Sequence, residues 1–121
     1  MSTGYVVFAH GSSIESANDA VRVVAAEMAR RGQLETVAAA FLEGGQPDLA
    51  GALEAMAGKV SRVVVVPYFL TLGLHLQRDL PRLIGHMKRA HPGLAIEVTP
   101  PLDQHPVMVE ALLDRARQGG Q

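Results

Sequence analysis

Residues 63–75 of the chain read VVVVPYFLTLGLH, and residues 5–13 read YVVFAHGSS. Each stretch begins with an unbroken apolar run rich in β-branched residues, which is typical of a strand buried on both faces in a parallel sheet covered by helices. Each run leads to a histidine, His10 in one case and His75 in the other. In open sheets of this kind, ligands bind beyond the carboxyl ends of the strands. The two stretches therefore predict a fold class and the edge at which a functional site lies.

The rest of the chain alternates strand and helix in the same way. We expect strands at 4–9, 35–41, 62–69 and 94–99, and helices at 14–31, 47–57, 75–91 and 106–117. Gly32 is expected to end the first helix as a C-terminal glycine. His105 is expected to cap the helix that Pro106 starts, and residues 118–121 are expected to be frayed. No linker or repeat interrupts the pattern, so residues 1–121 form a single predicted domain.

Strand–helix alternation implies right-handed crossovers and therefore a three-layer α/β/α architecture with a four-stranded parallel sheet. For a short sheet of this kind, the common doubly wound strand order is 2-1-3-4. In that order the first and third strands are neighbours, and the winding of the chain reverses between them. Since His10 and His75 follow these two strands, we expect both to face the crevice at the switch point.

Composition limits the classes of function. The chain has 121 residues, of which 48% are hydrophobic and 19% charged, as in one globular domain. It has no cysteine, which excludes disulfides and thiolate metal sites. A net charge of −1 and 4% aromatic residues argue against nucleic acid as a partner. Neither an apolar stretch of ~20 residues nor a signal-peptide pattern is present, so we expect a cytoplasmic protein with no membrane partner.

The two histidines suit a transition metal, because neutral imidazole is a common ligand for Zn, Co, Ni and Fe(II). His75 lies where a helix begins, and the positive end of the helix dipole disfavours its imidazolium form. Glu43 follows the second strand, at the same edge, and is a candidate proton acceptor or third ligand. The pair also has an ordinary interpretation, because a histidine after a strand can simply cap the next helix.

Two further groups are candidates for binding an anionic substrate. The turn Gly11-Ser12-Ser13 offers backbone N–H groups and hydroxyls where the first helix begins. Arg78 and Arg82 lie in the first turns of the third helix, within reach of carboxylates. As ordinary alternatives, the serines would be helix caps and the arginines would be surface charges.

Five segments carry a further signal in their order along nearly the whole chain. They are HGS at 10–12, FLE at 41–43, PYFL at 67–70 with GLH at 73–75, DLP at 79–81, and PPL at 100–102 with HP at 105–106. In this combination the chain resembles the small sirohydrochlorin chelatases of the CbiX type. The resemblance implies a chelatase-like half-domain that inserts Co²⁺, or Fe²⁺ or Ni²⁺ as in relatives, into sirohydrochlorin without ATP. It places the reaction in cobalamin or siroheme-type tetrapyrrole biosynthesis.

The resemblance also implies roles for single residues. His10 and His75 would hold the metal, which is a substrate, and Glu43 would assist proton removal; no organic cofactor is expected. Since larger relatives have two such domains facing a cleft, one copy implies a homodimer. Ser13 departs from the family pattern, which commonly has arginine there, and this predicts a changed contact to the carboxylates of the tetrapyrrole.

Two other functions remain open on the sequence. In a phosphocarrier of the mannose-type phosphotransferase system, His10 would carry phosphate, but His75 and the PYFL segment would then have no role. A non-catalytic metal or tetrapyrrole binder would use the same residues as a chelatase. Turnover separates that binder from an enzyme.

Overall fold

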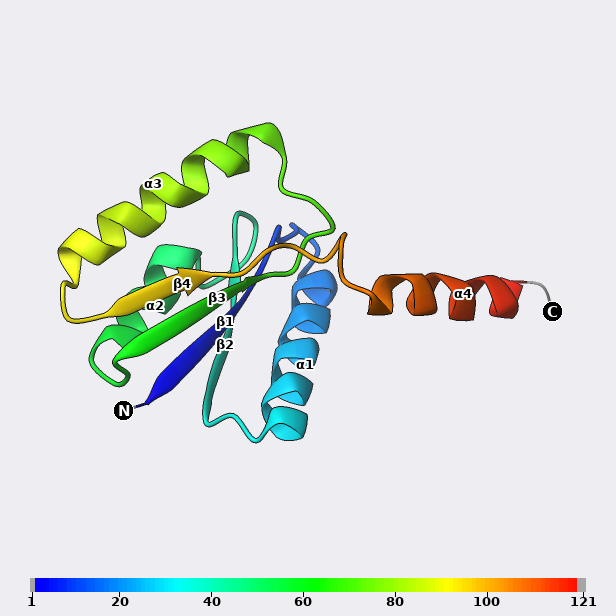
Figure 1. Ribbon diagram of the computed structural model, residues 1–121, viewed down its shortest axis with the longest axis horizontal. Helices are drawn as coiled ribbons and strands as arrows, with labels where there is room; N and C mark the ends of the chain where they lie inside the picture. Colours follow the sequence, from blue (N-terminus) through cyan, green and yellow to red (C-terminus); the bar gives the residue numbers. More distant parts are fainter. Residues whose placement is uncertain (1, 120–121) are drawn as a thin grey trace.

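The computed structural model describes residues 2–119, and within them four strands alternate with four helices (Figure 1). The predicted elements are confirmed, with shifts of a few residues at their ends. Their bounds are β1 (Thr3–Ala9), α1 (Glu15–Gly32), β2 (Thr36–Phe41), α2 (Leu49–Ala57), β3 (Arg62–Pro67), α3 (Leu74–Ala90), β4 (Ala95–Val98) and α4 (Val107–Gly119).

The four strands form one parallel sheet in the order β2-β1-β3-β4, as the sequence predicts. Val6 at the centre of β1 pairs with Ala38 of β2 and Val65 of β3. Phe8 lies opposite Pro67, so β1 and β3 end together at the carboxyl edge of the sheet. The segments that carry His10 and His75 therefore leave the same edge.

The main core lies between the sheet and the helices α2 and α3. The side chains that β1 and β3 direct toward it are fully buried, namely Val6, Phe8, Val63 and Val65. They pack against apolar residues of the two helices, including Leu53, Leu80, Ile84 and Met87. Because successive side chains in a strand point to opposite faces, the remaining residues of β1 and β3 face the other side of the sheet.

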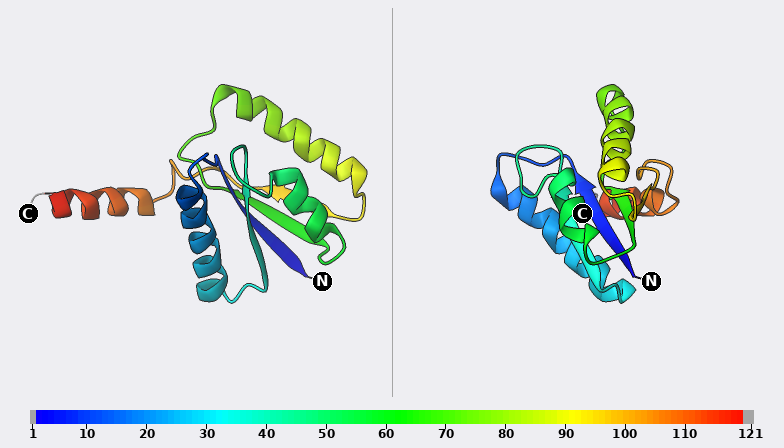
Figure 2. Two further views of the ribbon diagram at one scale, coloured as in Figure 1. Left: turned by 180° about the vertical axis from the view of Figure 1, so that it is seen from behind. Right: turned by 90° about the vertical axis from the view of Figure 1, so that its left-hand side faces the viewer.

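Helix α1 covers that other side, over β2 and part of β1 (Figure 2). Its inward stripe includes Ala25, which is buried, and Val21 and Met28, which are half-buried. Gly32 does not end this helix in the predicted way. It is the last helical residue, and the left-handed conformation falls on Gln33 (φ 52°), whose N–H reaches the carbonyls of Ala29 and Arg30.

Helix α4 leaves the body of the protein and extends beyond it (Figures 1 and 2). It has no buried residue. The Nδ1 of His105 accepts a hydrogen bond from the N–H of Val107 (3.1 Å), so His105 caps this helix as expected. The helix continues through residues 118 and 119, and the fraying expected at 118–121 stays a prediction; residues 120 and 121 lie outside the described residues. Within the described residues, no helix is both long and apolar enough to cross a bilayer.

Candidate functional site

His10 and Glu43 lie side by side at the carboxyl edge of the sheet. The parallel pairing of β1 with β2 continues past both strands: Leu42 N–H donates to Ala9 O (2.9 Å), and Glu43 N–H donates to His10 O (3.0 Å). This register brings His10 Nε2 to 3.7 Å from Glu43 Oε1. Both side chains are largely exposed, at 62% and 72%, and are therefore accessible to a ligand from solvent.

The imidazole of His10 is oriented by its neighbours. Its Nδ1 lies 3.2 Å from the carbonyl oxygen of Gly11, and a carbonyl can only accept. This contact therefore favours the tautomer with a proton on Nδ1 and a lone pair on Nε2, the arrangement typical of metal-ligating histidines. The ring also packs edge-on against Phe69, with 6.4 Å between the two ring centroids. The free lone pair thus lies on the side of Glu43.

Two glycines allow the loops after β1 and β2 to approach each other. Gly11 has φ +88°, and a Cβ there would lie 1.8 Å from the carbonyl oxygen of Glu43. Gly44 has φ +73°, and a Cβ there would lie 2.8 Å from the backbone of Ser12. The His10 loop and the Glu43 loop therefore interlock backbone to backbone, which fixes the spacing of the two side chains.

Asn18 of α1 joins the same two loops through hydrogen bonds to their backbones. It is only 1% exposed, and it is the one polar side chain buried in the core of the described residues. Its Oδ1 accepts from the N–H of Ser12 (2.9 Å), while its Nδ2 donates to the carbonyls of Ser12 (2.9 Å) and Gly44 (3.1 Å). Asn18 was not among the site residues predicted from the sequence. The available signal was an asparagine on the inward stripe of α1, three residues before Val21 and seven before Ala25.

Arg22, one turn after Asn18 in α1, contacts the segment that follows Glu43. Its guanidinium bonds Glu15 (2.6 Å) and Asp19 (2.7 Å), donates to the carbonyl of Gln46 (3.0 Å), and lies 5.1 Å above the ring of Phe41. The hydrogen bond from Arg22 is the main cause that lowers the pKa of Glu15. The pKa of Arg22 is raised in turn, chiefly by the hydrogen bond to Glu15. The start of α1 is thus held to the segment that follows Glu43.

Part of the predicted anion cradle at residues 11–13 is used by internal bonds. The N–H of Ser12 donates to Asn18, and the hydroxyl oxygen of Ser12 accepts from the N–H of Ile14 (3.0 Å). The amide of Ser12 therefore serves to anchor the start of α1, and the cradle stays a prediction. The hydroxyl of Ser12 still has a proton to donate, and Ser13 is exposed.

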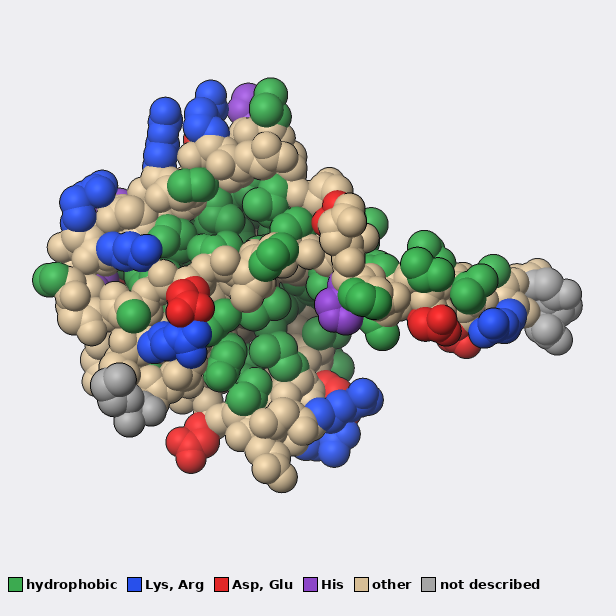
Figure 3. Space-filling model, viewed as in Figure 1, with side chains coloured by type: hydrophobic (Ala, Val, Ile, Leu, Met, Phe, Trp, Pro, Cys, Tyr) green, Lys and Arg blue, Asp and Glu red, His purple; other side chains and the backbone are tan. Residues whose placement is uncertain are grey.

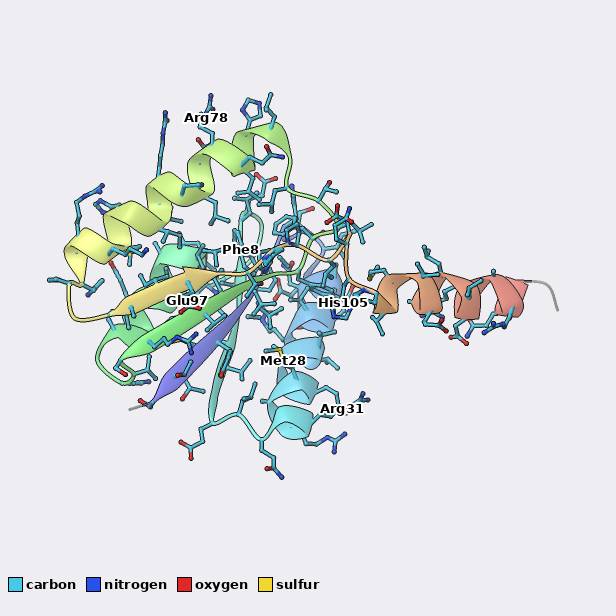
Figure 4. All side chains as sticks on the ribbon, viewed as in Figure 1. Phe8, Met28, Arg31, Arg78, Glu97 and His105 are labelled. Atoms are coloured by element: carbon cyan, nitrogen blue, oxygen red, sulfur yellow. The ribbon has the colours of Figure 1, made fainter. Side chains whose placement is uncertain are left out.

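His75 lies at the same edge but in a different setting. The loop of residues 68–73 separates it from β3 and places it in the first turn of α3. Its Nδ1 lies 3.4 Å from a guanidinium nitrogen of Arg78, which also bonds Asp79 (3.2 Å). Arg82 is exposed one turn further along, and Figure 4 shows Arg78 pointing away from the sheet.

The structure thus brings the predicted site residues together in two pairs, His10 with Glu43 and His75 with Arg78. Within residues 2–119, no hydrogen bond or ring contact joins His10 to His75, and no cluster of three or more His, Asp or Glu side chains could hold a metal ion. The described chain by itself therefore offers a partial site, open to solvent.

The fold and site define a class: doubly wound parallel α/β proteins with a histidine and a carboxylate paired at the carboxyl edge. The CbiX family model matches residues 4–119, which is nearly all of the chain. The protein therefore belongs to the CbiX family, as the sequence motifs indicate.

Several curated relatives are named sirohydrochlorin cobaltochelatase. The protein from Methanosarcina barkeri is 33% identical over 83 residues, covering 68% of this chain and 64% of that protein. The protein from Methanopyrus kandleri is 35% identical over 81 residues, and the match spans only 57% of its length. The protein from Methanococcoides burtonii is 27% identical over 124 residues, covering 95% of both chains.

Solved structures show the same fold. A CbiX protein from Marinobacter aquaeolei VT8 superposes with a TM-score of 0.82 at 27% identity, covering 97% of this chain and 96% of that one. SirB from Bacillus subtilis, solved with Fe³⁺, superposes with a TM-score of 0.87 at 21% identity. That match covers all of this chain but 48% of SirB, so this chain has about half the length of SirB.

Proposed function

We propose that this protein is a chelatase that inserts a divalent metal, Co²⁺ in the first place and Fe²⁺ or Ni²⁺ as alternatives, into sirohydrochlorin. The observation that carries the proposal is the oriented pair of His10 and Glu43 at the edge where α/β sheets bind ligands. The names of the sequence relatives support the same substrate. The proposal includes a reaction without an organic cofactor or ATP, and a cytoplasmic location.

Metallation of a tetrapyrrole has two requirements: the ion must lose water ligands, and two pyrrole nitrogens must lose their protons. His10 Nε2 presents a lone pair for the ion. Two ligands bound about 2.1 Å from one tetrahedral ion lie about 3.4 Å apart, close to the 3.7 Å between Nε2 and Oε1. Glu43 can therefore approach the ion with His10 and accept a pyrrole proton as the metal transfers.

The second group of residues completes the site from α3. His75 is the second imidazole for the ion, and Arg78 and Arg82 are placed on the exposed face of the same helix to pair with substrate carboxylates. The hydroxyls of Ser12 and Ser13 can donate hydrogen bonds to the same substrate carboxylates. Because His75 does not contact His10 here, we propose that the two meet around the macrocycle rather than in the free protein.

A homodimer is the working form in this proposal. One unit presents one wall of an open site, and a flat macrocycle has two faces to be enclosed. Because this chain is about half as long as SirB, a second copy of it would supply the other wall of the site.

The test mixes purified protein and sirohydrochlorin with Co²⁺, Fe²⁺ or Ni²⁺ and follows the absorbance change. We expect acceleration over the uncatalysed rate with at least one metal. His10→Ala and Glu43→Gln should each lower the rate by about 10²-fold or more. His86→Ala is the matched control, because His86 is exposed further along α3.

No acceleration with any metal would contradict the chelatase. Tight binding of metal or tetrapyrrole without turnover would favour the non-catalytic binder instead. Unchanged rates in both variants would refute the assigned site.

A further inference from the structure

The two histidines that the proposed function assigns to the metal differ in which ring nitrogen is free. The Nδ1 of His10 faces a carbonyl oxygen, which can only accept, so the proton lies on Nδ1 and the lone pair on Nε2 is free. The Nδ1 of His75 lies 3.4 Å from a guanidinium nitrogen of Arg78 instead. Because a guanidinium can only donate, the Nδ1 of His75 is the acceptor in this contact and carries the lone pair.

The contact with Arg78 occupies the one lone pair that a neutral His75 has for a metal. The proton of the ring then lies on Nε2, which is a donor and cannot ligate. Binding an ion through Nε2 would move the proton to Nδ1 and place two N–H donors against each other. Binding an ion through Nδ1 would require the guanidinium to leave, and the positive charge of Arg78 repels a divalent cation in either case. His75 is therefore withheld from the metal as long as Arg78 stays at its ring.

Asp79 holds the guanidinium of Arg78 from its other side. The Nε of Arg78 donates to Oδ1 of Asp79 (3.2 Å), whereas the contact with His75 comes from a terminal nitrogen of the same guanidinium. A hydrogen bond between two charged groups is stronger than one to a neutral imidazole, and 3.4 Å is long for a hydrogen bond. The contact with His75 is therefore the weaker of the two and the first to break.

A carboxylate of the substrate would draw the guanidinium away from His75. Arginine binds a carboxylate through two parallel charge-assisted hydrogen bonds, which are stronger than the contact with a neutral ring. Figure 3 shows Lys and Arg side chains gathered along the outer side of α3, and Asp79 is the one acidic residue of this helix. A substrate with several carboxylates is therefore attracted to this side of α3. The exposed cations there are Arg78, Arg82, Lys88 and Arg89.

We infer that Arg78 withholds His75 from the metal until a carboxylate of the tetrapyrrole takes the guanidinium. The metal site is then completed only when the macrocycle that receives the ion is in place. Before that, the free protein holds the ion through His10 and Glu43 without the second imidazole, which favours transfer of the ion over its retention. Arg78 thus acts through His75 as a positioning residue. It has this role only if His75 is the second imidazole for the ion, so the inference rests on the proposed function.

The first test measures the affinity of the protein for Co²⁺ without tetrapyrrole, by isothermal titration calorimetry. Arg78→Met removes the guanidinium from an exposed position of α3, and circular dichroism checks that the fold is retained. We expect the Kd for Co²⁺ to fall about fivefold or more, because the ring nitrogen is released from its hydrogen bond. Arg82→Met is the matched control: it removes the same charge one turn further along α3 and should leave the Kd for Co²⁺ nearly unchanged.

A double-mutant cycle with His75→Ala separates the release of His75 from the loss of a positive charge. In the native background, His75→Ala should leave the Kd for Co²⁺ of the free protein nearly unchanged, because Arg78 already withholds the ring. In the Arg78→Met background, the same substitution should abolish the gain in affinity.

Three outcomes of the calorimetry overturn the inference. The first is a Kd for Co²⁺ that Arg78→Met does not lower, and the absence of measurable binding in both chains counts as this outcome. The second is a gain in affinity that persists when His75→Ala is added. The third is a native protein whose affinity for Co²⁺ already falls strongly with His75→Ala.

The second test compares the effects on the two substrates. Arg78→Met should raise the KM for sirohydrochlorin, because a contact to a carboxylate is lost, while it tightens the binding of Co²⁺ to the free protein. Arg82→Met should raise the KM for sirohydrochlorin without tightening the binding of Co²⁺. A purely structural role of Arg78 would weaken both, so weaker binding of Co²⁺ contradicts the inference. The chelatase assay of the native chain tests the proposed function separately, because the calorimetry requires no turnover.

Discussion

At the scale of the residue, the site depends on one buried amide. Asn18 bonds the backbone of both loops that carry His10 and Glu43. Asn18→Ala leaves the N–H of Ser12 and the carbonyl of Gly44 without their partner, which should cost about 1–3 kcal/mol of unfolding free energy. We also expect a lower kcat, because the 3.7 Å spacing of His10 and Glu43 relaxes. Urea unfolding and initial rates measure the two effects.

The control for this prediction is Ser16→Ala, on the same helix as Asn18 but exposed. If Asn18 acts only on stability, the kcat of Asn18→Ala should recover at low temperature, where the folded fraction is complete. A kcat equal to that of the native protein under those conditions would contradict a positioning role.

The sequence could predict some of these residues and not others, for physical reasons. His10 and Glu43 directly follow parallel strands, so strand order alone brings them together. Asn18 was missed because an asparagine in a helix is usually exposed, and only the packing of α1 on the loops buries it. His75 was predicted to lie at the same crevice as His10. A loop separates it from β3, and nothing local in the sequence defines where that loop directs the side chain.

At the scale of the element, Gly11 allows the loops after β1 and β2 to interlock. Gly11→Ala combines a positive φ with a Cβ that would lie 1.8 Å from a backbone oxygen. We expect a loss of about 1–3 kcal/mol or more in unfolding free energy, together with loss of chelatase activity. The control is Gly58→Ala, since a Cβ at Gly58 meets nothing within 4 Å and its φ is −91°. Equal stability of the two variants in thermal unfolding would show that Gly11→Ala introduces no strain.

The last turns of α1 give a prediction for pH. Glu27 forms ion pairs with Arg30 and Arg31, and the hydrogen bond from Arg30 is the main cause that lowers the pKa of Glu27 from 4.5 to about 2. A lowered pKa in the folded state stabilises the fold above the unfolded pKa, and this stabilisation is lost as the pH falls through the folded value. The pairs are exposed, so the effect is small.

We therefore expect the stability difference between the native protein and Glu27→Gln to be constant at neutral pH and to shrink between pH 4.5 and about 2. Urea unfolding across that range measures it, with Glu54→Gln on α2 as the control. A difference that stays the same at the lowest pH would show that the ion pairs contribute nothing.

The ends of a helix could be predicted where a capping residue or a glycine marks them. Asp48 caps α2 through its bond to the N–H of Gly51 (2.8 Å), and Gly58 follows its end. The direction of α4 had no such signal. Its amphipathic pattern predicts a helix with a buried side, whereas α4 has no buried residue in the described chain.

At the scale of the whole molecule, the proposed dimer would make this fold one half of an enclosure. The strand order follows from the alternation of strand and helix, and it was predictable because right-handed crossovers leave few alternatives. The open site was not predictable from any one segment. If a second copy of the chain closes the site, as we propose, assembly and catalysis must be coupled.

This coupling makes the specific activity depend on protein concentration. Dilution below the dimer dissociation constant should lower the chelatase rate per chain in parallel with the dimer fraction from light scattering. A constant specific activity across the dissociation range would mean that each copy is a complete enzyme, and His75 would then have to reach His10 within a single chain.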